Sequence, residues 1–178
     1  MVDASSKFQD SLPISSDELL KTLDQLNIKY NLFEHVPLRT VEDSKKVQGI
    51  FISSENGGGH VKNLYLRDKK KKNILLVAQQ DQTVDLKQLS KNLGFSNLSF
   101  GSPKRLMQHL GVRPGSVTPL SMITGVKNDV SLFLDKNLKN KSVIYIHPLV
   151  NDRTIEMTIE NLEKFFSKVG INFMWTDL

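Results

Sequence analysis

Gly-Val-Arg-Pro-Gly-Ser-Val-Thr-Pro-Leu, residues 111–120, is the most constrained stretch of the chain, with two glycines and two prolines in ten residues. Proline fixes φ and glycine permits φ > 0, so few backbone paths remain open to this segment. Gly111 is the expected end of a helix that begins at Ser102-Pro103. Beyond it, the polar groups are mostly backbone N–H groups, together with the hydroxyls of Ser116 and Thr118. Such a loop either binds a carbonyl, ester or phosphate through main-chain donors, or is a rigid connector without a ligand.

The overall composition is that of an ordinary globular domain. The chain has 178 residues, of which 39% are hydrophobic and 24% are charged, and this predicts one domain with a substantial core. The absence of cysteine excludes disulfides, thiolate catalysis and cysteine-ligated zinc, and it fits a cytoplasmic protein. No apolar run reaches the length of about 18 residues that suggests a membrane span, and the N-terminus lacks a signal-peptide pattern, so no membrane partner is expected.

The net charge is +5, and the positive side chains are densest in one short segment. This basic cluster consists of Arg67, Lys69, Lys70, Lys71 and Lys72. In a protein that binds nucleic acid, such a cluster contacts phosphates. In other proteins, lysines keep the tip of a β-hairpin solvated. The sequence leaves both interpretations open.

Helix and strand signals follow one another along most of the chain. Residues 1–14 are polar and unpatterned, which predicts a flexible N-terminal arm ahead of one domain at 15–178. Helices are expected to begin at the N-cap residues Ser15, Thr40, Asp85, Ser102 and Thr158, and Gly94, Gly111 and Gly170 are expected to end the last three. Strands are expected at 30–36, 49–53, 60–67, 74–78, 98–100, 130–134, 142–146, 154–157 and 171–175. We therefore predict an α+β fold, with a mixed, largely antiparallel sheet and helices packed outside it.

Lys62 occupies an unusual place in the predicted strand 60–67. The period of two residues puts it on one face with Leu64 and Leu66, and puts Asn63 on the other face. A lysine beside two leucines either extends from the end of the strand into solvent or points into a lined pocket. In a pocket, its charge would bind an anionic group.

Several common catalytic motifs are absent. The sequence contains no G-x-x-x-x-G-K-[ST], no G-x-G-x-x-G after a strand, no H-E-x-x-H and no G-x-S-x-G. Its four histidines show no metal-ligand spacing, so neither a metal nor another cofactor is expected. Hydrolysis without a metal, or simple binding, remains.

Three segments in order along the chain support a more specific hypothesis. They are Val61-Lys62-Asn63-Leu64-Tyr65-Leu66-Arg67-Asp68, Gly115-Ser116-Val117-Thr118-Pro119 and Ile146-His147-Pro148-Leu149-Val150-Asn151-Asp152. The second fits a G-x-x-x-P loop, and together they resemble the YbaK/prolyl-tRNA synthetase-associated domain family of aminoacyl-tRNA editing domains. The likeness runs from about Leu19 to the end of the chain and is greatest to the freestanding ProX-type members, which hydrolyse alanyl-tRNA(Pro). It implies a single domain with a strongly curved, barrel-like sheet.

The resemblance also implies a site. Residues that match Lys62, Gly115 and His147 line the pocket of the family, so these three are the expected catalytic residues. Expected substrate contacts are Asn63, Ser116, Thr118, Pro119 and Asn151, and the basic cluster is expected to bind tRNA. The mechanism implied uses a ribose hydroxyl of the tRNA to help position the attacking water, which would explain the lack of a nucleophile. Mischarged tRNA(Pro) is the implied partner, and prolyl-tRNA synthetase is a second candidate.

The aminoacyl group and the role of single residues stay open. A small pocket beside Gly115 would admit alanine and exclude the larger proline ring, as a second sieve does. A cysteinyl-tRNA(Pro) deacylase is the close competitor. From other classes, the alternatives are a catalytically silent module that binds tRNA or a synthetase, and a small-molecule hydrolase unconnected with RNA. His147 is either catalytic or a hydrogen-bonded structural residue at the end of a strand.

Overall fold

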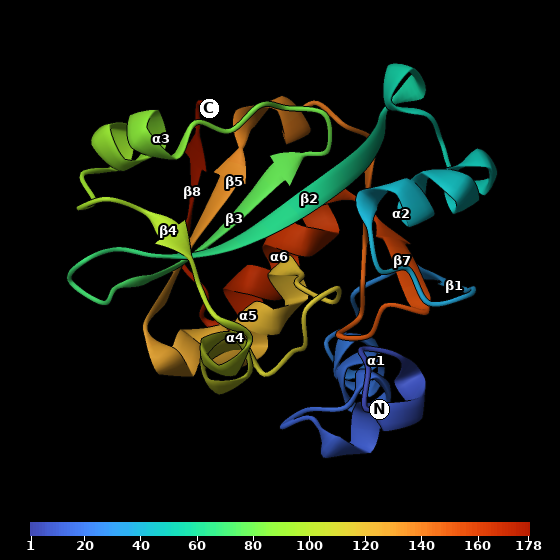
Figure 1. Cartoon of the computed structure of the whole chain (residues 1–178). Helices are drawn as coiled ribbons and strands as arrows, with labels where there is room; N and C mark the ends of the chain where they lie inside the picture. The colour runs from blue at the N-terminus through green and yellow to red at the C-terminus, as the bar shows by residue number, and fades with distance from the viewer.

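Eight strands and six α-helices provide the regular structure of the computed structural model, which describes all residues 1–178 (Figure 1). The strands are β1 Asn31–Glu34, β2 Gly58–Arg67, β3 Asn73–Gln79, β4 Ser99–Phe100, β5 Val130–Asp135, β6 Val143–Ile146, β7 Arg153–Met157 and β8 Phe173–Thr176. The α-helices are α1 Ser16–Gln25, α2 Val41–Val47, α3 Leu86–Leu93, α4 Pro103–Leu110, α5 Met122–Gly125 and α6 Ile159–Val169. Short 3-10 helices include η1 Ser6–Ser11 and η2 Gln48–Ile50. None of the helices has both the length and the apolar character that crossing a membrane requires.

All eight strands belong to one mixed sheet, as predicted. The strand order is β1-β7-β6-β2-β3-β5-β8, and β4 pairs with β2 beside this path. Four of the pairings are antiparallel, whereas β6–β2, β3–β5 and β5–β8 are parallel. The sheet is strongly twisted along β2 but does not close into a barrel, because β1 and β8 have no partner on their outer sides (Figure 1).

Both faces of the central strands are buried. Leu75 and Val77 of β3 belong to a core of 26 buried residues that also contains Phe165 and Phe166 of α6. The alternate β3 residues, such as Leu76, belong to a smaller core that is covered by α3. This arrangement explains why residues 74–78 are continuously apolar instead of alternating.

The predicted helix ends are confirmed by their capping contacts. Ser15 and Glu18 form the expected capping box: the Ser15 hydroxyl accepts the Glu18 N–H at 3.1 Å, and the Glu18 carboxylate accepts the Ser15 N–H at 2.7 Å. Ser102 caps α4 and Gly111 ends it in the left-handed conformation, with φ of 67°. The caps of α4 thereby fix where the loop of residues 111–120 begins.

The predicted strand at residues 49–53 is wrong. Helix α2 continues through η2 to Ile50, and the chain then bends toward β2 without joining the sheet. Phe51 stacks on the Tyr145 ring with centroids 4.5 Å apart, and the Ile52 N–H donates to the Tyr145 hydroxyl at 2.9 Å. Because β6 already pairs with the start of β2, this segment is held by aromatic packing instead of strand pairing.

Residues 1–14 also differ from the expected flexible arm. They contain η1, and Ala4 and Leu12 are buried. Leu12 joins the main core, and the Ser6 hydroxyl donates to the Asp152 carboxylate at 2.7 Å. A polar, unpatterned segment is therefore ordered by contacts with residues far away in the sequence.

Candidate functional site

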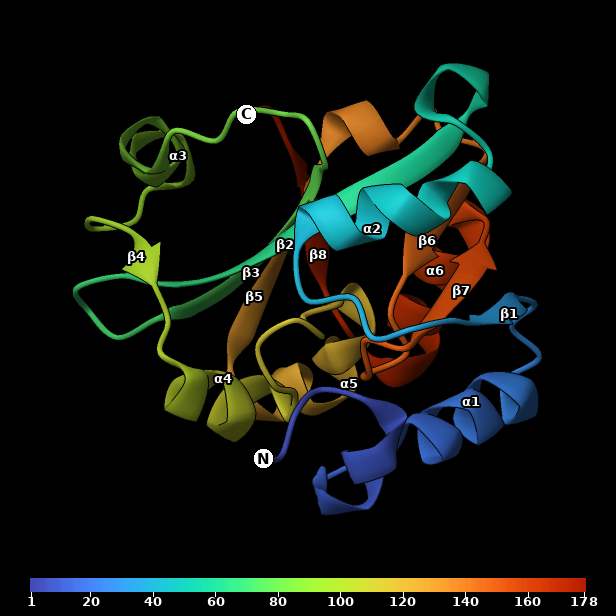
Figure 2. The same ribbon diagram turned by 45° about the vertical axis from the view of Figure 1, so that its right-hand side comes forward.

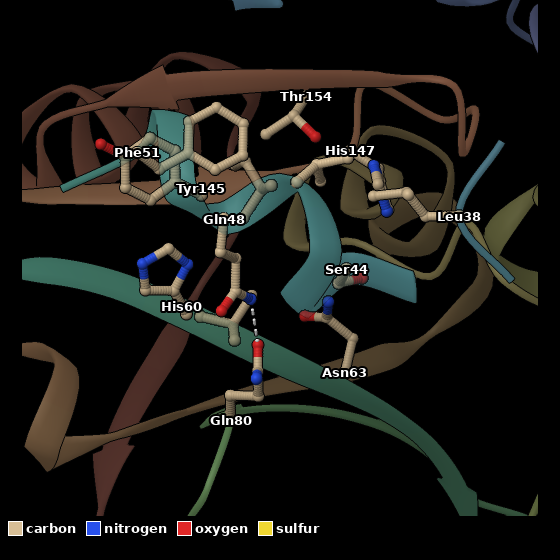
Figure 3. A pocket seen from close by; sticks show the side chains of 13 residues that line it. Leu38, Ser44, Gln48, Phe51, His60, Asn63, Gln80, Tyr145, His147 and Thr154 are labelled. Carbon is tan, nitrogen blue, oxygen red and sulfur yellow. Dashed lines mark hydrogen bonds between the residues drawn. The ribbon is translucent and has the colours of Figure 1, made fainter. Parts of the chain in front are cut away.

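Residues of α2 and strand β2 line a cleft. In Figure 2, α2 lies in front of β2. The outer chamber of the cleft has a volume of about 290 Å³ and its inner chamber one of about 60 Å³. The two chambers adjoin and are together called the cleft, because both are lined by Leu38, Ser44, Val61, Asn63 and His147. Figure 3 shows the side chains that line the inner chamber, with Asn63 and Ser44 drawn below His147 and Thr154.

The three predicted catalytic residues meet at the outer chamber. Lys62 comes from β2, Gly115 from the loop that follows α4, and His147 from the turn that follows β6. These elements are distant in the sequence and come together because β6 pairs in parallel with the first residues of β2. The structure thus juxtaposes the three sequence segments that carry the family resemblance.

Lys62 is half-buried at the side of the cleft. Its ammonium donates to the main-chain carbonyl of Gln82, in the segment that follows β3. An ammonium has three N–H donors, so this contact holds the side chain while leaving donors for an anionic group.

The hydrogen bonds of His147 fix the state of its ring. Its Nδ1 lies 2.7 Å from the Arg153 carbonyl oxygen, so Nδ1 carries the proton, and Nε2 has no partner within the chain. Burial lowers the pKa of His147 below its ordinary value, although the Arg153 hydrogen bond opposes this effect. The neighbouring His35, whose ring centroid is 6.2 Å away, lowers the pKa further. At neutral pH the ring is therefore uncharged and offers the Nε2 lone pair as a proton acceptor.

Gly115 forms part of the wall of the outer chamber. Its φ of +92° lies in the left-handed region, which side chains rarely adopt. A Cβ built at Gly115 would lie 3.5 Å from Asn151 Nδ2 and 3.8 Å from the Leu38 carbonyl oxygen, so it would fit without a clash. The N–H groups of Gly115 and Val117 have no hydrogen-bond partner within the chain, and both residues line the chamber. They are available donors for a carbonyl oxygen.

Three of the predicted substrate contacts lie on the other side of this loop. Ser116, Thr118 and Pro119 are buried and do not line the cleft. The Ser116 hydroxyl donates to the Ala4 carbonyl at 3.2 Å, and the Thr118 hydroxyl oxygen caps the Leu120 N–H at 3.3 Å. Thr118 is extended, with φ of −154° and ψ of 150°, and the preceding residue, Val117, lines the cleft instead. A period of two residues starting at Gly115 would have selected Val117 but also Pro119, which is buried, so the sequence alone does not single out Val117.

The two predicted asparagines differ in position. Asn63 lines both chambers, and its buried Oδ1 has no hydrogen-bond partner, so it is free to accept one from a ligand. Asn151 lies behind the wall. Its side-chain Nδ2 donates to the Leu38 carbonyl at 2.9 Å, and its main-chain carbonyl accepts the Leu38 N–H at 2.8 Å. Asn151 therefore holds Leu38 in place instead of lining the cleft.

Apart from Asn63 and His147, sequence analysis did not find the residues of the inner chamber. Gln48 donates to the Gln80 side chain at 2.7 Å across the chamber (Figure 3). Tyr145 stacks on His60 with ring centroids 5.0 Å apart and donates its hydroxyl to Glu156 at 2.6 Å. Burial and the Glu156 hydrogen bond raise the pKa of Tyr145 to about 12, so the phenol stays protonated. No local pattern indicates these residues, because they meet only when α2 and η2 dock against β2.

The basic cluster lies at the far end of β2 from the cleft, around the turn into β3 (Figure 1). Its lysines are exposed, and Lys71 has a left-handed φ of 67°. The Asp68 carboxylate accepts the Lys72 N–H at 2.9 Å and closes the turn. Five residues of β2 lead from Lys62 to Arg67, where the strand ends, which corresponds to about 17 Å. The basic cluster can therefore contact only parts of a ligand that extend well beyond the cleft. No three His, Asp or Glu side chains come together as metal ligands would.

Comparison with known proteins identifies the family. Residues 35–165, which include every residue lining the cleft, match the family model of the aminoacyl-tRNA editing domain. The chain belongs to this family. The editing domain described here is 37% identical over 161 residues to the prolyl-tRNA editing protein ProX of Acetoanaerobium sticklandii, covering 90% of this chain and 95% of that protein. It is 36% identical over 159 residues to the prolyl-tRNA synthetase associated domain-containing protein 1 of Xenopus laevis, and this match covers 86% of this chain and 90% of that protein.

Solved structures agree with the fold of the editing domain. A proposed trans-editing enzyme for prolyl-tRNA synthetase superposes with a TM-score of 0.67 at 18% identity, over 92% of this chain and 96% of that one. A scaffold protein used for epitope grafting gives a TM-score of 0.69 at 18% identity, over 92% of this chain and 95% of that one. At these identities, the likeness shows the shared fold alone.

Proposed function

We propose that this editing domain acts in trans on mischarged tRNA(Pro) and hydrolyses the ester that joins alanine to the terminal ribose. The observation that carries the proposal is the composition of the outer chamber. Its lining residues carry the free N–H groups of Gly115 and Val117, the ammonium of Lys62 and the free Nε2 of His147. Membership of the editing family, and the ProX relative named for prolyl-tRNA editing, support an aminoacyl ester as the substrate.

Each of these groups has a part in ester hydrolysis. Water attacks the ester carbonyl carbon, and the N–H groups of Gly115 and Val117 donate to the oxygen on which negative charge develops. The neutral Nε2 of His147, together with the adjacent ribose hydroxyl, orients the water and receives its proton. The bond between carbonyl carbon and ribose oxygen then breaks, the proton passes to the ribose oxygen, and alanine leaves as a carboxylate. Lys62 holds the neighbouring phosphate of the tRNA.

Asn63 and the inner chamber supply the features that would select the amino acid. The unpartnered Oδ1 of Asn63 is an acceptor for the α-ammonium group of the aminoacyl ester. The inner chamber of about 60 Å³ leaves room for a small side chain. One methylene group changes binding by only about 1–3 kcal/mol, so a separate sieve of this kind adds to the selection made during charging. Cysteine, with one more heavy atom than alanine, is the second candidate substrate.

The experiment compares tRNA(Pro) charged with alanine, cysteine and proline, mixed separately with the protein, while loss of the ester is followed. We expect alanyl-tRNA(Pro) to be hydrolysed fastest and prolyl-tRNA(Pro) to be spared. The Lys62→Ala variant provides the control for hydrolysis at this site. Faster hydrolysis of the cysteinyl ester would reassign the substrate. Retention of intact alanyl-tRNA without hydrolysis would make the protein a silent binding module.

The same proposal defines the cellular setting. Charged tRNA is made and used in the cytoplasm, so we place the reaction there, with mischarged tRNA(Pro) as the partner. Prolyl-tRNA synthetase is the enzyme whose errors the reaction would correct, and it is the candidate protein partner. Co-elution of the two proteins with and without tRNA tests that contact.

A further inference from the structure

The first residues of the chain contact both loops that form the wall of the cleft. In Figure 2 the dark-blue N-terminal segment lies beside the loop that follows α4. The Ala4 carbonyl oxygen accepts two hydrogen bonds, from the Ser116 hydroxyl at 3.2 Å and from the Asn151 N–H at 2.8 Å. Ser116 is next to Gly115, and Asn151 follows His147 by four residues. A single carbonyl therefore links the Gly115 loop to the His147 loop.

Contacts on either side of Ala4 hold it in this position. The Asp152 carboxylate accepts the Ser6 N–H at 2.8 Å and the Ser6 hydroxyl at 2.7 Å. The Asp3 carboxylate accepts the Ser5 N–H at 2.9 Å and the Ser5 hydroxyl at 2.6 Å. Asp3 also lies 3.8 Å from the Arg39 guanidinium, at the rim of the outer chamber. Ala4 and Ser5 are buried, at 6% and 7% exposure.

The link continues from Ala4 to the lining of the cleft. Asn151, whose N–H is held by Ala4, exchanges two hydrogen bonds with Leu38, and Leu38 lines both chambers. The side chain of Asn151 also lies where a Cβ on Gly115 would contact it. The position of Ala4 thus affects two walls of the cleft, although Ala4 itself does not line it.

We propose that Asp3–Ser6 form a positioning element, the N-terminal clasp, which sets the distance between the Gly115 loop and the His147 loop. The inference rests on the proposed hydrolysis at this cleft and adds residues that lie outside the family match, which begins at residue 35. The clasp touches no substrate. It acts through Ser116, Asn151 and Asp152.

The test compares three variants with the parent protein. The first variant lacks residues 2–5 and so has no Ala4 carbonyl. The second, Ser116→Ala, removes the hydroxyl that donates to this carbonyl. The third, Val2→Ser, alters an exposed residue and is the matched control. Each is measured for kcat and KM with alanyl-tRNA(Pro), for thermal unfolding and for hydrogen exchange at the Asn151 amide.

We expect the deletion to lower kcat by about tenfold or more, since small misplacement of reacting groups is costly, and to leave KM within about twofold because the clasp touches no tRNA. Exchange at the Asn151 amide becomes faster, whereas exchange of β3 amides in the core does not change. Ser116→Ala lowers kcat less and leaves the Asn151 amide protected. Val2→Ser behaves as the parent does.

A folded deletion variant with parental kcat overturns the proposal. If the deletion variant does not fold, a parental kcat in Ser116→Ala overturns the proposal instead. If the parent protein hydrolyses no aminoacyl-tRNA, the proposed function is contradicted. Hydrogen exchange at the Asn151 amide then tests the clasp separately. Protection there that disappears on deletion supports the clasp, and rapid exchange in the parent overturns it.

Discussion

Gly115 combines a left-handed backbone with a place on the wall of the cleft, and one substitution separates these two features. Asparagine tolerates positive φ better than other side chains, and a Cβ at this position meets nothing closer than 3.5 Å. We expect Gly115→Asn to keep its stability within about 1 kcal/mol. Its hydrolysis of alanyl-tRNA should nevertheless collapse, because the amide group beyond Cβ occupies the space of the aminoacyl ester. Thermal melts and deacylation rates on one preparation measure both effects.

Gly94→Asn is the matched control for this substitution. Gly94 has a φ of +71° and ends α3, and a Cβ at this position would have no other atom within 4 Å. The control variant should keep full activity. A stable and fully active Gly115→Asn protein would show that the Gly115 loop does not bound the substrate site.

The lowered pKa of His147 predicts how the reaction rate depends on pH. Burial holds its pKa below the ordinary value of 6.5, and the neutral ring is the form that accepts a proton. We therefore expect kcat/KM to stay constant as pH falls from neutrality, and to decline only below pH 6.5, where the ring becomes protonated. This acid limb should disappear in His147→Asn, together with most of the activity.

The same shift affects stability, with a definite sign. Because the folded state disfavours protonation of His147, the unfolded state binds the proton first as pH falls below 6.5. The contribution of His147 to stability is therefore present above that pH and decreases below it. His35→Gln, which removes the neighbouring ring, is the control and should keep the acid limb of kcat/KM. An acid limb that persists in His147→Asn would assign the titration to another group.

At the scale of single elements, the basic turn between β2 and β3 is the part with two competing interpretations. Lys72 lies 6.0 Å from the Phe95 ring centroid and has a local packing role, whereas the exposed side chains of Lys69, Lys70 and Lys71 form no hydrogen bond or ion pair. We expect the triple variant Lys69→Ser, Lys70→Ser and Lys71→Asn to bind tRNA more weakly. Asparagine is chosen at Lys71 because of its φ of 67°.

The salt dependence of tRNA binding distinguishes the two interpretations. Removing one lysine–phosphate interaction should reduce the slope of log K against log salt by about 0.7–0.9. Lys168→Gln, an exposed lysine at the end of α6, should leave the slope unchanged. An unchanged slope in the triple variant would return the basic turn to the role of a solvated hairpin tip.

Elements were predicted well where the signal is local and poorly where it is not. Ser102 and Gly111 bound α4 because capping depends on neighbouring backbone groups alone. The predicted strand at 49–53 failed because Phe51 packs on the Tyr145 ring, which lies almost a hundred positions further along the chain, while Ile50 and Ile52 are exposed. No periodicity within five residues distinguishes these two ways of burying apolar surface.

At the scale of the whole molecule, the α+β class and the mixed sheet could be predicted, but the strand order could not. The continuous apolar run at 74–78 required a central strand, and β3 lies between β2 and β5. The parallel pairing of β2 with β6 depends on long-range contacts that leave no mark in either strand. The site shows the same division: the segments around Lys62, Gly115 and His147 could be named, whereas the inner chamber and the role of Ala4 required the fold.

The contacts of Ala4 have a consequence for the synthesis of the protein. Ala4 and Ser6 bind residues 116 and 151–152, which the ribosome adds more than a hundred positions later. Until then Ala4 and Ser6 lack these partners, and the wall of the cleft is incomplete. A nascent chain would therefore lack a formed hydrolytic site while it is surrounded by the correctly charged tRNAs that are building it. Editing activity would begin only after residues 151–152 have been added and have bound the N-terminal segment.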